Sequence, residues 1–246
     1  MTFPSDRFCW FDYVSKDSAK AQGFFGELFN WTTKVQGDYT MIAAGDQLIG
    51  AYRPTPQGAP PHAHWLAYLQ VESAKATLAK ITAAGGKQLA APAPMGEVGT
   101  WAVAADPLGA PFALWQPAKA EGGDFSHKPS TFCWNELYTD HPEKSVAFYE
   151  AIGNLRDKPM DMGPMGTYHV LESFGTSRAG IMKSPMAGIP QHWMPYVQVA
   201  SCDATVAKAK KLGFEIKVAG MDAPGVGRFG VLIDPLGSSL GVLQPA

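Results

Sequence analysis

The chain has 246 residues, of which 46% are hydrophobic and 17% charged, and its formal net charge is −2. A chain of this size can bury the core of one or two domains, and it lacks the dense Lys/Arg patches of a nucleic-acid or anionic-membrane binder. Its first residues do not form a basic and apolar leader, and no apolar run is long enough to span a bilayer. We therefore expect a cytoplasmic protein that binds a small molecule, with no nucleic-acid or membrane partner.

In chain order, the first predicted elements are a strand over residues 8–14 and a helix that starts near Asp17-Ser18. Apolar residues at Phe24, Phe25 and Leu28 give this helix one buried face. A second helix is predicted over residues 73–84, ending at Gly85. The remaining strands of the first half are predicted at residues 39–44, 48–52, 65–71, 101–105 and 112–116.

The second half repeats this order of elements. Phe8-Cys9-Trp10 returns as Phe132-Cys133-Trp134, and Asp106-Pro107-Leu108-Gly109 returns as Asp234-Pro235-Leu236-Gly237. A repeat of about 120 residues is a duplication of a whole fold. We expect domains at residues 1–120 and 130–246, joined by a linker over residues 118–130 that contains Gly122-Gly123 and Pro129. Strands are predicted at residues 132–138, 168–172, 179–182, 193–199, 229–233 and 240–244, with helices starting near Asp140-Pro142 and at Ser201.

A doubled β-α-β-β-β unit, with a helix carrying Phe-Phe or Phe-Tyr and an Asp-Pro-x-Gly turn, resembles the vicinal oxygen chelate superfamily. This superfamily includes glyoxalase I, extradiol dioxygenases and bleomycin-resistance proteins. Within it, the chain is most similar to tandem two-domain proteins described as predicted enzymes related to lactoylglutathione lyase. The resemblance covers almost the whole chain. It implies an α+β fold of two tandem glyoxalase-like domains, each built of two β-α-β-β-β modules whose curved mixed sheets form a ligand-binding cup.

The resemblance also implies where the metal-using relatives carry their His, Gln or Glu ligands. On the first strand of each copy this position is Trp10 or Trp134, and on the last strand it is Ala113 or Gly241. The two other positions fall near Leu66 and Gly50-Ala51, with counterparts at Met194 and Gly180-Ile181. None of these residues is a credible ligand for a divalent cation. We therefore expect no cofactor and no metal at the usual place.

The residues beside these tryptophans indicate what lines the cup instead. Strand side chains alternate, so Phe8 and Asp12 should share the face of Trp10, as Phe132 and Glu136 should share that of Trp134. An indole can stack on a flat ligand while a desolvated carboxylate orients a polar group or acts as a base. Asp12 and Glu136 are therefore candidate catalytic residues. The alternative is an acid paired at the end of its strand.

A second polar set lies on the strands that open the later half of each copy. His64, Tyr68 and Gln70 recur in register as His192, Tyr196 and Gln198. Histidine at such a position serves as a ligand, a base or a structural group. His169, beside Tyr168, is expected to face the second cavity. The ligand-binding candidates are Trp10, Asp12, His64, Tyr68, Gln70, Trp134, Glu136, His169, His192, Tyr196 and Gln198.

Three functions follow from this pattern. The first is a protein that binds a small aromatic or amphipathic molecule in a metal-free cup. The second is a divalent-metal-dependent lyase or dioxygenase with displaced ligands drawn from His64, Glu136, His169 or His192. The third is an interaction protein in which one domain supports the other. The sequence leaves open whether the chain is an enzyme and whether it forms a homodimer.

Overall fold

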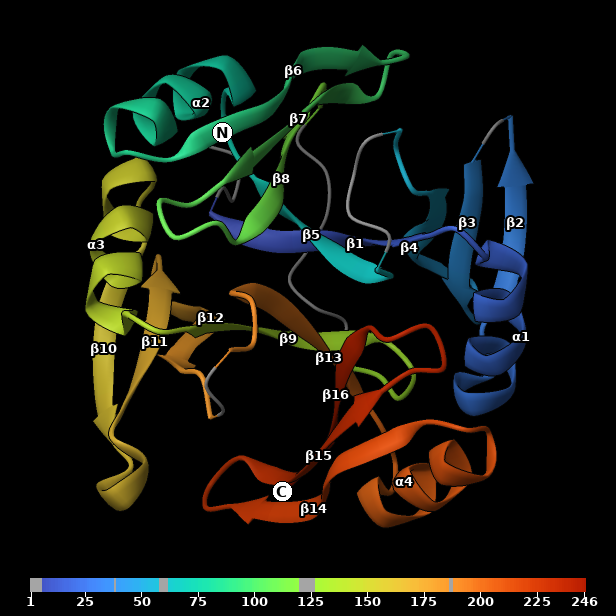
Figure 1. Cartoon of the computed structure of the whole chain (residues 1–246). Helices are drawn as coiled ribbons and strands as arrows, with labels where there is room; N and C mark the ends of the chain where they lie inside the picture. Colours follow the sequence, from blue (N-terminus) through green and yellow to red (C-terminus); the bar gives the residue numbers. More distant parts are fainter. Residues whose placement is uncertain (1–5, 38, 58–61, 120–126, 186–187) are drawn as a thin grey trace. The chain divides into compact units, whose positions relative to one another are not determined.

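The computed structural model describes residues 6–37, 39–57, 62–119, 127–185 and 188–246 (Figure 1). The first copy contains β1 (Arg7–Ser15), α1 (Ser18–Phe29), β2 (Thr32–Gln36), β3 (Tyr39–Ala44), β4 (Gln47–Pro54), β5 (His64–Gln70), α2 (Ala74–Ala83), β6 (Lys87–Met95), β7 (Gly99–Ala105) and β8 (Pro111–Pro117). The second copy contains β9 (Phe132–Thr139), α3 (Pro142–Ile152), β10 (Arg156–Asp161), the short helix η1 (Gly163–Met165), β11 (Thr167–Ser173), β12 (Thr176–Lys183), β13 (His192–Gln198), α4 (Cys202–Lys211), β14 (Glu215–Ala223), β15 (Gly227–Ile233) and β16 (Ser239–Pro245).

The strands of each copy form one mixed sheet of eight strands. The order is β2-β3-β4-β1-β5-β8-β7-β6 in the first copy and β10-β11-β12-β9-β13-β16-β15-β14 in the second. The first strand of a module pairs in parallel with the last, as β1 does with β4 and β13 with β16, whereas successive strands within a module pair antiparallel. This arrangement confirms the predicted α+β class and the four β-α-β-β-β modules.

Contacts divide the chain into two compact units, and each unit takes one module from each copy. One unit contains Met1–Cys9, Ala67–Asp124 and Trp134–Trp193, and the other contains Trp10–Leu66, Phe125–Cys133 and Met194–Ala246. In the first unit α2 packs against α3, and in the second α1 packs against α4. The domain boundaries at residues 1–120 and 130–246 stay a prediction, because these units follow contacts and not the sequence repeat.

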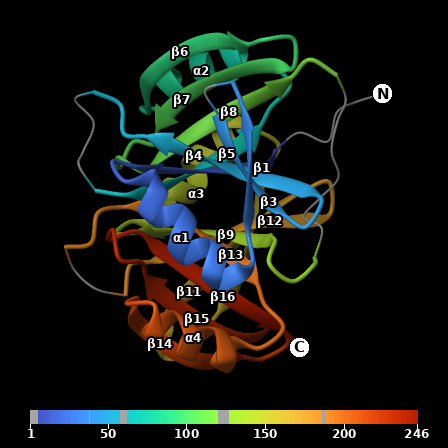
Figure 2. The same cartoon turned by 90° about the vertical axis from the view of Figure 1, so that its right-hand side faces the viewer.

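Each unit has its own aromatic core on the helix side of its strands. In the unit that contains α1 and α4 (Figure 2), Phe25 lies against Tyr13, and the Phe24 ring lies 5.2 Å from that of Phe214. In the other unit, the Phe112 ring lies 5.6 Å from that of Tyr149. The apolar face predicted for the first helix is therefore the buried one, since Phe24, Phe25 and Leu28 of α1 are all buried.

The outermost strands β2, β6, β10 and β14 were not predicted from the sequence. All five residues of β2 are exposed, and β10 is nearly as exposed, so neither has the apolar alternation that signals a half-buried strand. Residues 160–165 contain the end of β10 and the short helix η1. These edges form because a neighbouring strand supplies backbone hydrogen-bonding partners.

Most of the predicted helix ends are confirmed. Asp17 caps α1 by accepting a hydrogen bond from the Lys20 amide, and Ser73 and Ser201 cap α2 and α4 in the same way. The cap of α3 is His141 and not Asp140, and it makes no side-chain cap bond, with Pro142 at the first helical position. The linker contains residues 120–126, which lie outside the described residues.

The two Asp-Pro-Leu-Gly segments are tight turns, as expected. Gly109 and Gly237 have φ of 101° and 93°, a backbone region that glycine adopts without steric cost. The Asp106 carboxylate accepts hydrogen bonds from the amides of Leu108 and Ala110. Among the described residues, no helix has the length and apolar character needed to cross a bilayer.

Candidate functional site

In the first copy, β1, β3 and β4 bring an indole, a carboxylate, a phenol and a guanidinium together. Trp10 Nε1 donates to Asp12 Oδ1 at 2.8 Å, and Arg53 Nη1 lies 3.4 Å from Asp12 Oδ2. The Arg53 guanidinium lies over the Tyr39 ring, 5.4 Å from its centroid. Asp12 is only 1% exposed, whereas Trp10, Tyr39 and Arg53 are half-buried. We call this surface the Trp10 face.

In the second copy, the equivalent surface is built differently. Trp134 Nε1 donates to the hydroxyl of Tyr168 at 2.9 Å, and the same hydroxyl is hydrogen-bonded to Glu136. Glu136 is buried, and Trp134 and Tyr168 are half-buried. Burial, reinforced by the Glu136 carboxylate, raises the pKa of Tyr168 well above its ordinary value, so the phenol stays protonated and donates to the acid. We call this surface, with Met182, the Trp134 face.

A single missing β-carbon explains why the two faces differ. Gly180 pairs with Glu136, and a β-carbon on it would lie 1.9 Å from the Tyr168 hydroxyl. In the first copy Ala51 pairs with Asp12, so a methyl group fills the equivalent space. We infer that this methyl keeps Tyr39 from lying against the acid as Tyr168 does. The indole therefore meets Asp12 directly in one copy and reaches Glu136 through a phenol in the other.

The last-strand positions at which metal ligands were sought, Gly241 and Ala113, lie beside buried tyrosines. Tyr196 pairs with Gly241, and a β-carbon on Gly241 would lie 2.3 Å from the tyrosine ring. Tyr68 pairs with Ala113 in the equivalent register of the first copy. A glutamate at position 241 would therefore have to displace the buried Tyr196. The residues at these positions do not fit a divalent metal.

The proposed displaced ligands are not gathered either. Within the described ranges, no group of three His, Cys, Asp or Glu side chains could hold a metal ion. Burial raises the pKa of the Cys9 and Cys133 thiols to about 12, and each thiol donates to a backbone carbonyl on the neighbouring strand. Neither thiol is therefore poised as a thiolate ligand or nucleophile.

The two strand-start histidines make the same local contact. The Nδ1 atom of His64 donates to the His62 carbonyl at 3.2 Å, and that of His192 donates to the Pro190 carbonyl at 2.8 Å. Burial lowers the pKa of both rings, which favours the neutral imidazole near pH 7. The His192 ring also lies edge-on to Tyr138, 5.8 Å between centroids.

The two glutamines are engaged with chain segments outside their own strands. The Gln70 side-chain oxygen accepts from Arg7 at 3.0 Å and 3.3 Å, and both residues are buried. Gln198 Nε2 donates to the His127 carbonyl at 3.1 Å. Gln70 therefore anchors the start of β1, and Gln198 anchors the end of the linker. Whether either also touches a ligand stays a prediction.

His169 lies on the opposite side of β11 from Tyr168, because neighbouring strand residues alternate. Its Nδ1 donates to Asp157 at 2.8 Å, and it pairs with the fully buried Ile181. Whether His169 also faces the second cavity stays a prediction. Phe8 and Phe132 are also in the buried cores, against Trp193 and Phe11 respectively, and not beside the half-buried tryptophans.

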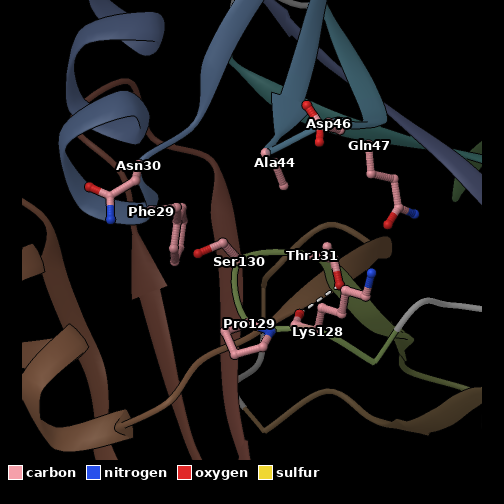
Figure 3. Close-up of a pocket in the computed structure, with 10 residues that line it drawn as sticks. Phe29, Asn30, Ala44, Asp46, Gln47, Lys128, Pro129, Ser130 and Thr131 are labelled. Carbon is pink, nitrogen blue, oxygen red and sulfur yellow. Dashed lines mark hydrogen bonds between the residues drawn. The ribbon is translucent and has the colours of Figure 1, made fainter.

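A groove of about 540 Å³ lies in the unit that contains α1. It lies between the end of that helix, the β3–β4 turn and the end of the linker, and the Phe29 ring points toward Ser130 (Figure 3). Trp31 Nε1 holds one wall by donating to the Ser130 carbonyl at 2.7 Å. None of the predicted site residues lines this groove.

Sequence reasoning missed Arg53 and Tyr39, and it noted Tyr168 only as the neighbour of His169. The usable signal was the repeat itself, since Tyr39 and Tyr168 occupy equivalent positions at or near the start of β3 and β11. Arg53 had no such signal, because its counterpart by strand register is Met182. Its role is visible only once β4 lies beside β1.

Comparison with known proteins agrees with this architecture. Residues 7–114 match the model of the Glyoxalase/Bleomycin resistance protein/Dioxygenase superfamily. The chain is 35% identical over 245 residues to "Putative glyoxylase CFP32" of Mycobacterium bovis, covering 96% of this chain and 94% of that protein. The chain belongs to this superfamily. A second superfamily relative, "Anthracycline biosynthesis protein DauV" of a Streptomyces species, is 32% identical over 255 residues, with coverage of 96% and 92%.

Solved structures of the superfamily show the same fold. The Mn(II)-bound glyoxalase from Novosphingobium aromaticivorans aligns with a TM-score of 0.68 at 16% identity, covering 99% of this chain and 83% of that one. The 2,3-dioxygenase LapB from Pseudomonas sp. KL28 aligns with a TM-score of 0.69 at 13% identity, covering 100% and 94%. At this identity the likeness concerns the fold alone, and the Mn(II) belongs to that glyoxalase.

Proposed function

We propose that this superfamily member binds a small aromatic or amphipathic molecule against its Trp10 and Trp134 faces without a metal. The observation that carries the proposal is a half-buried indole that recurs with a buried acid, bonded to Asp12 directly at Trp10 and linked to Glu136 through the Tyr168 hydroxyl at Trp134. Both copies keep this pairing although they build it from different neighbours. A surface that served packing alone would not need a buried carboxylate, which costs free energy to desolvate.

The chemistry of the two faces suits such a ligand. A half-buried indole offers a flat apolar surface on which an aromatic ring stacks, which contributes about 0.5–1.5 kcal/mol beyond area burial. Asp12 and Glu136 orient polar groups of the ligand through the hydrogen-bonded network around them. With a net charge of −2 and no basic patch in the sequence, a small molecule is a better partner than a nucleic acid.

The relatives indicate which compounds to test first. One relative is named for anthracycline biosynthesis and another as a glyoxylase. Anthracyclines are fused-ring aromatic compounds, so anthraquinones and naphthalenes are suitable probes of this chain. This choice comes from the relatives' names and concerns only the class of compound.

Isothermal titration calorimetry with an anthraquinone and naphthalene series tests the proposal. We expect saturable binding that Trp10→Leu or Trp134→Leu weakens about ten-fold or more at its own face, which is the loss of a well-packed aromatic contact. Phe174→Leu is the matched control, because Phe174 is 67% exposed at the turn between β11 and β12 and belongs to neither face. Absence of binding by any aromatic compound, or binding that both tryptophan variants leave unchanged, would overturn the proposal.

A further inference from the structure

We propose that Arg53 makes the Trp10 face selective for ligands that carry an anionic group, an aromatic carboxylate being the simplest, whereas the Trp134 face lacks this selectivity. The inference rests on the proposed function, since it assigns a ligand class to one of the two binding faces. It concerns only residues of the unit that contains β1–β4.

Arg53 and Trp10 are held beside one another by the same carboxylate. Asp12 Oδ1 accepts from the indole at 2.8 Å, and Asp12 Oδ2 faces Arg53 Nη1 at 3.4 Å. The Asp12 side chain is 2% exposed and that of Arg53 is 28% exposed. The Asp12 carboxylate is thus buried, whereas part of the Arg53 guanidinium is exposed to solvent. A ring stacked on Trp10 would place a substituent near Arg53.

The guanidinium is also oriented for recognition of an anion. It lies over the Tyr39 ring, and a cation–π contact of this kind holds its plane at a half-buried site. A guanidinium presents its N–H donors in a rigid fork that matches the two oxygens of a carboxylate. Arg53 carries five N–H donors and its side chain is 28% exposed, so the guanidinium that faces Asp12 from within the protein can also meet a ligand carboxylate at the surface.

The second copy provides an internal comparison. Val14 pairs with Arg53, and Tyr138, the counterpart of Val14, pairs with Met182. A thioether therefore occupies the position of the guanidinium. The buried Glu136 is hydrogen-bonded to the Tyr168 phenol, so this face presents a carboxylate without a cation at the equivalent place. An anionic ligand gains nothing there and is repelled by the acid.

Two naphthalene probes, one with an anionic carboxylate and one with a neutral hydroxymethyl group, separate these possibilities. We would titrate 2-naphthoate and 2-naphthylmethanol by calorimetry into the full-length chain and into Arg53→Met, which installs the counterpart's residue. We expect the wild type to bind 2-naphthoate about ten-fold or more tightly than the alcohol at one site, the size expected for a charge-assisted pair. Arg53→Met should remove that preference and leave the affinity for the alcohol within about two-fold.

Three further variants complete the design. Trp10→Leu should abolish the naphthoate site and Trp134→Leu should keep it. Arg228→Met is the charge-matched control, because Arg228 on β15 pairs with Asp203 on α4 and with Asp222 on β14, so its replacement should not affect either probe. Arg53→Lys keeps the charge and loses the planar fork, so about a three-fold or greater loss of naphthoate affinity is expected even if Arg53→Met fails to fold.

The outcomes distinguish this inference from the proposed function. If folded Arg53→Met and Arg53→Lys bind 2-naphthoate as the wild type does, the inference that Arg53 selects anionic ligands is wrong, while the proposal of aromatic binding stands. If the wild type prefers the alcohol, the inference is equally wrong. If neither probe nor any other aromatic compound binds the wild type, the proposed function fails and the inference falls with it.

Discussion

The ring of Tyr196 lies over Gly241 so closely that a β-carbon on the glycine would approach its Cδ1 atom to 2.3 Å. The two residues are paired across parallel strands β13 and β16, and the tyrosine is 6% exposed. The last-strand position at which a glutamate was expected in metal-using relatives is therefore closed by an aromatic ring. Restoring a metal ligand here would require the ring to leave.

This contact predicts that Gly241→Ala destabilises the protein. The added methyl overpacks a buried ring, which costs about 1–3 kcal/mol. Urea unfolding measures the change in the free energy of unfolding. Gly23→Ala is the control, since Gly23 is exposed within α1 with nothing near its added β-carbon and should gain up to about 1 kcal/mol. A Gly241→Ala variant as stable as the wild type would show that Tyr196 does not lie there.

A second prediction concerns Gly180 and Tyr168, which we expect to be energetically coupled. Gly180→Ala should cost about 1–3 kcal/mol, because its methyl would displace the phenol from Glu136 and Trp134. The same substitution should cost at least about 1 kcal/mol less in a Tyr168→Ala background. The double-mutant cycle by urea unfolding measures this difference. Additive costs would contradict the geometry of the Trp134 face.

A third prediction concerns Tyr13, whose hydroxyl donates to Asp234 at 2.7 Å in a buried contact. Tyr13→Phe should cost about 1–3 kcal/mol at neutral pH, because it leaves a carboxylate oxygen buried without its donor. Tyr52→Phe, a neighbouring buried tyrosine that is not bonded to Asp234, is the control. An equal loss in both variants would contradict this role of the Tyr13 hydroxyl.

The cost of Tyr13→Phe should also depend on pH. Burial raises the pKa of Asp234 and the Tyr13 hydrogen bond opposes that rise, so the variant raises the pKa further. A raised pKa in the folded state means that stability is retained below the unfolded value of 3.8 and is lost as pH rises through the folded pKa. The difference between variant and wild type should therefore shrink when unfolding is measured below pH 3.8. A difference that is constant with pH would contradict this linkage.

A fourth prediction concerns His64 and His192, whose pKa values burial lowers from 6.5. The folded state prefers the neutral rings, so their contribution is complete above pH 6.5 and is lost as pH falls from there through the folded pKa. His64→Gln and His192→Gln should flatten the fall in stability between pH 6.5 and about 5, measured by urea unfolding. Replacement of the exposed His127 is the control. Unchanged pH profiles would show that these rings titrate alike in both states.

The fold was largely predictable because its signals are local and occur twice. The apolar face of α1, the capping residues Asp17 and Ser73 and the Asp-Pro-Leu-Gly turns each act through neighbours in the chain. The edge strands were not predictable in the same way. The exposed β2 carries no periodic apolar pattern, and its pairing with β3 comes from a partner strand and not from its own residues.

The candidate site was predictable only in part. Trp10, Asp12, Trp134 and Glu136 were found because strand alternation places residues two apart on one face. Arg53 was missed because its contact with Asp12 depends on the register of β4 against β1. The two acids differ in surroundings at Ala51 against Gly180 and at Arg53 against Met182, and these differences become apparent only from the pairing of the strands.

The composition of the two compact units bears on how the duplicated chain holds together. Each unit contains one module from each copy, as the contact between Phe24 of the first copy and Phe214 of the second illustrates. A chain severed in its linker would therefore behave as two obligate subunits, each exposing apolar surface until it met the other. Neither copy supplies both modules of a unit, so a substitution on a helix face that packs between copies, such as Phe24 against Phe214, perturbs both copies.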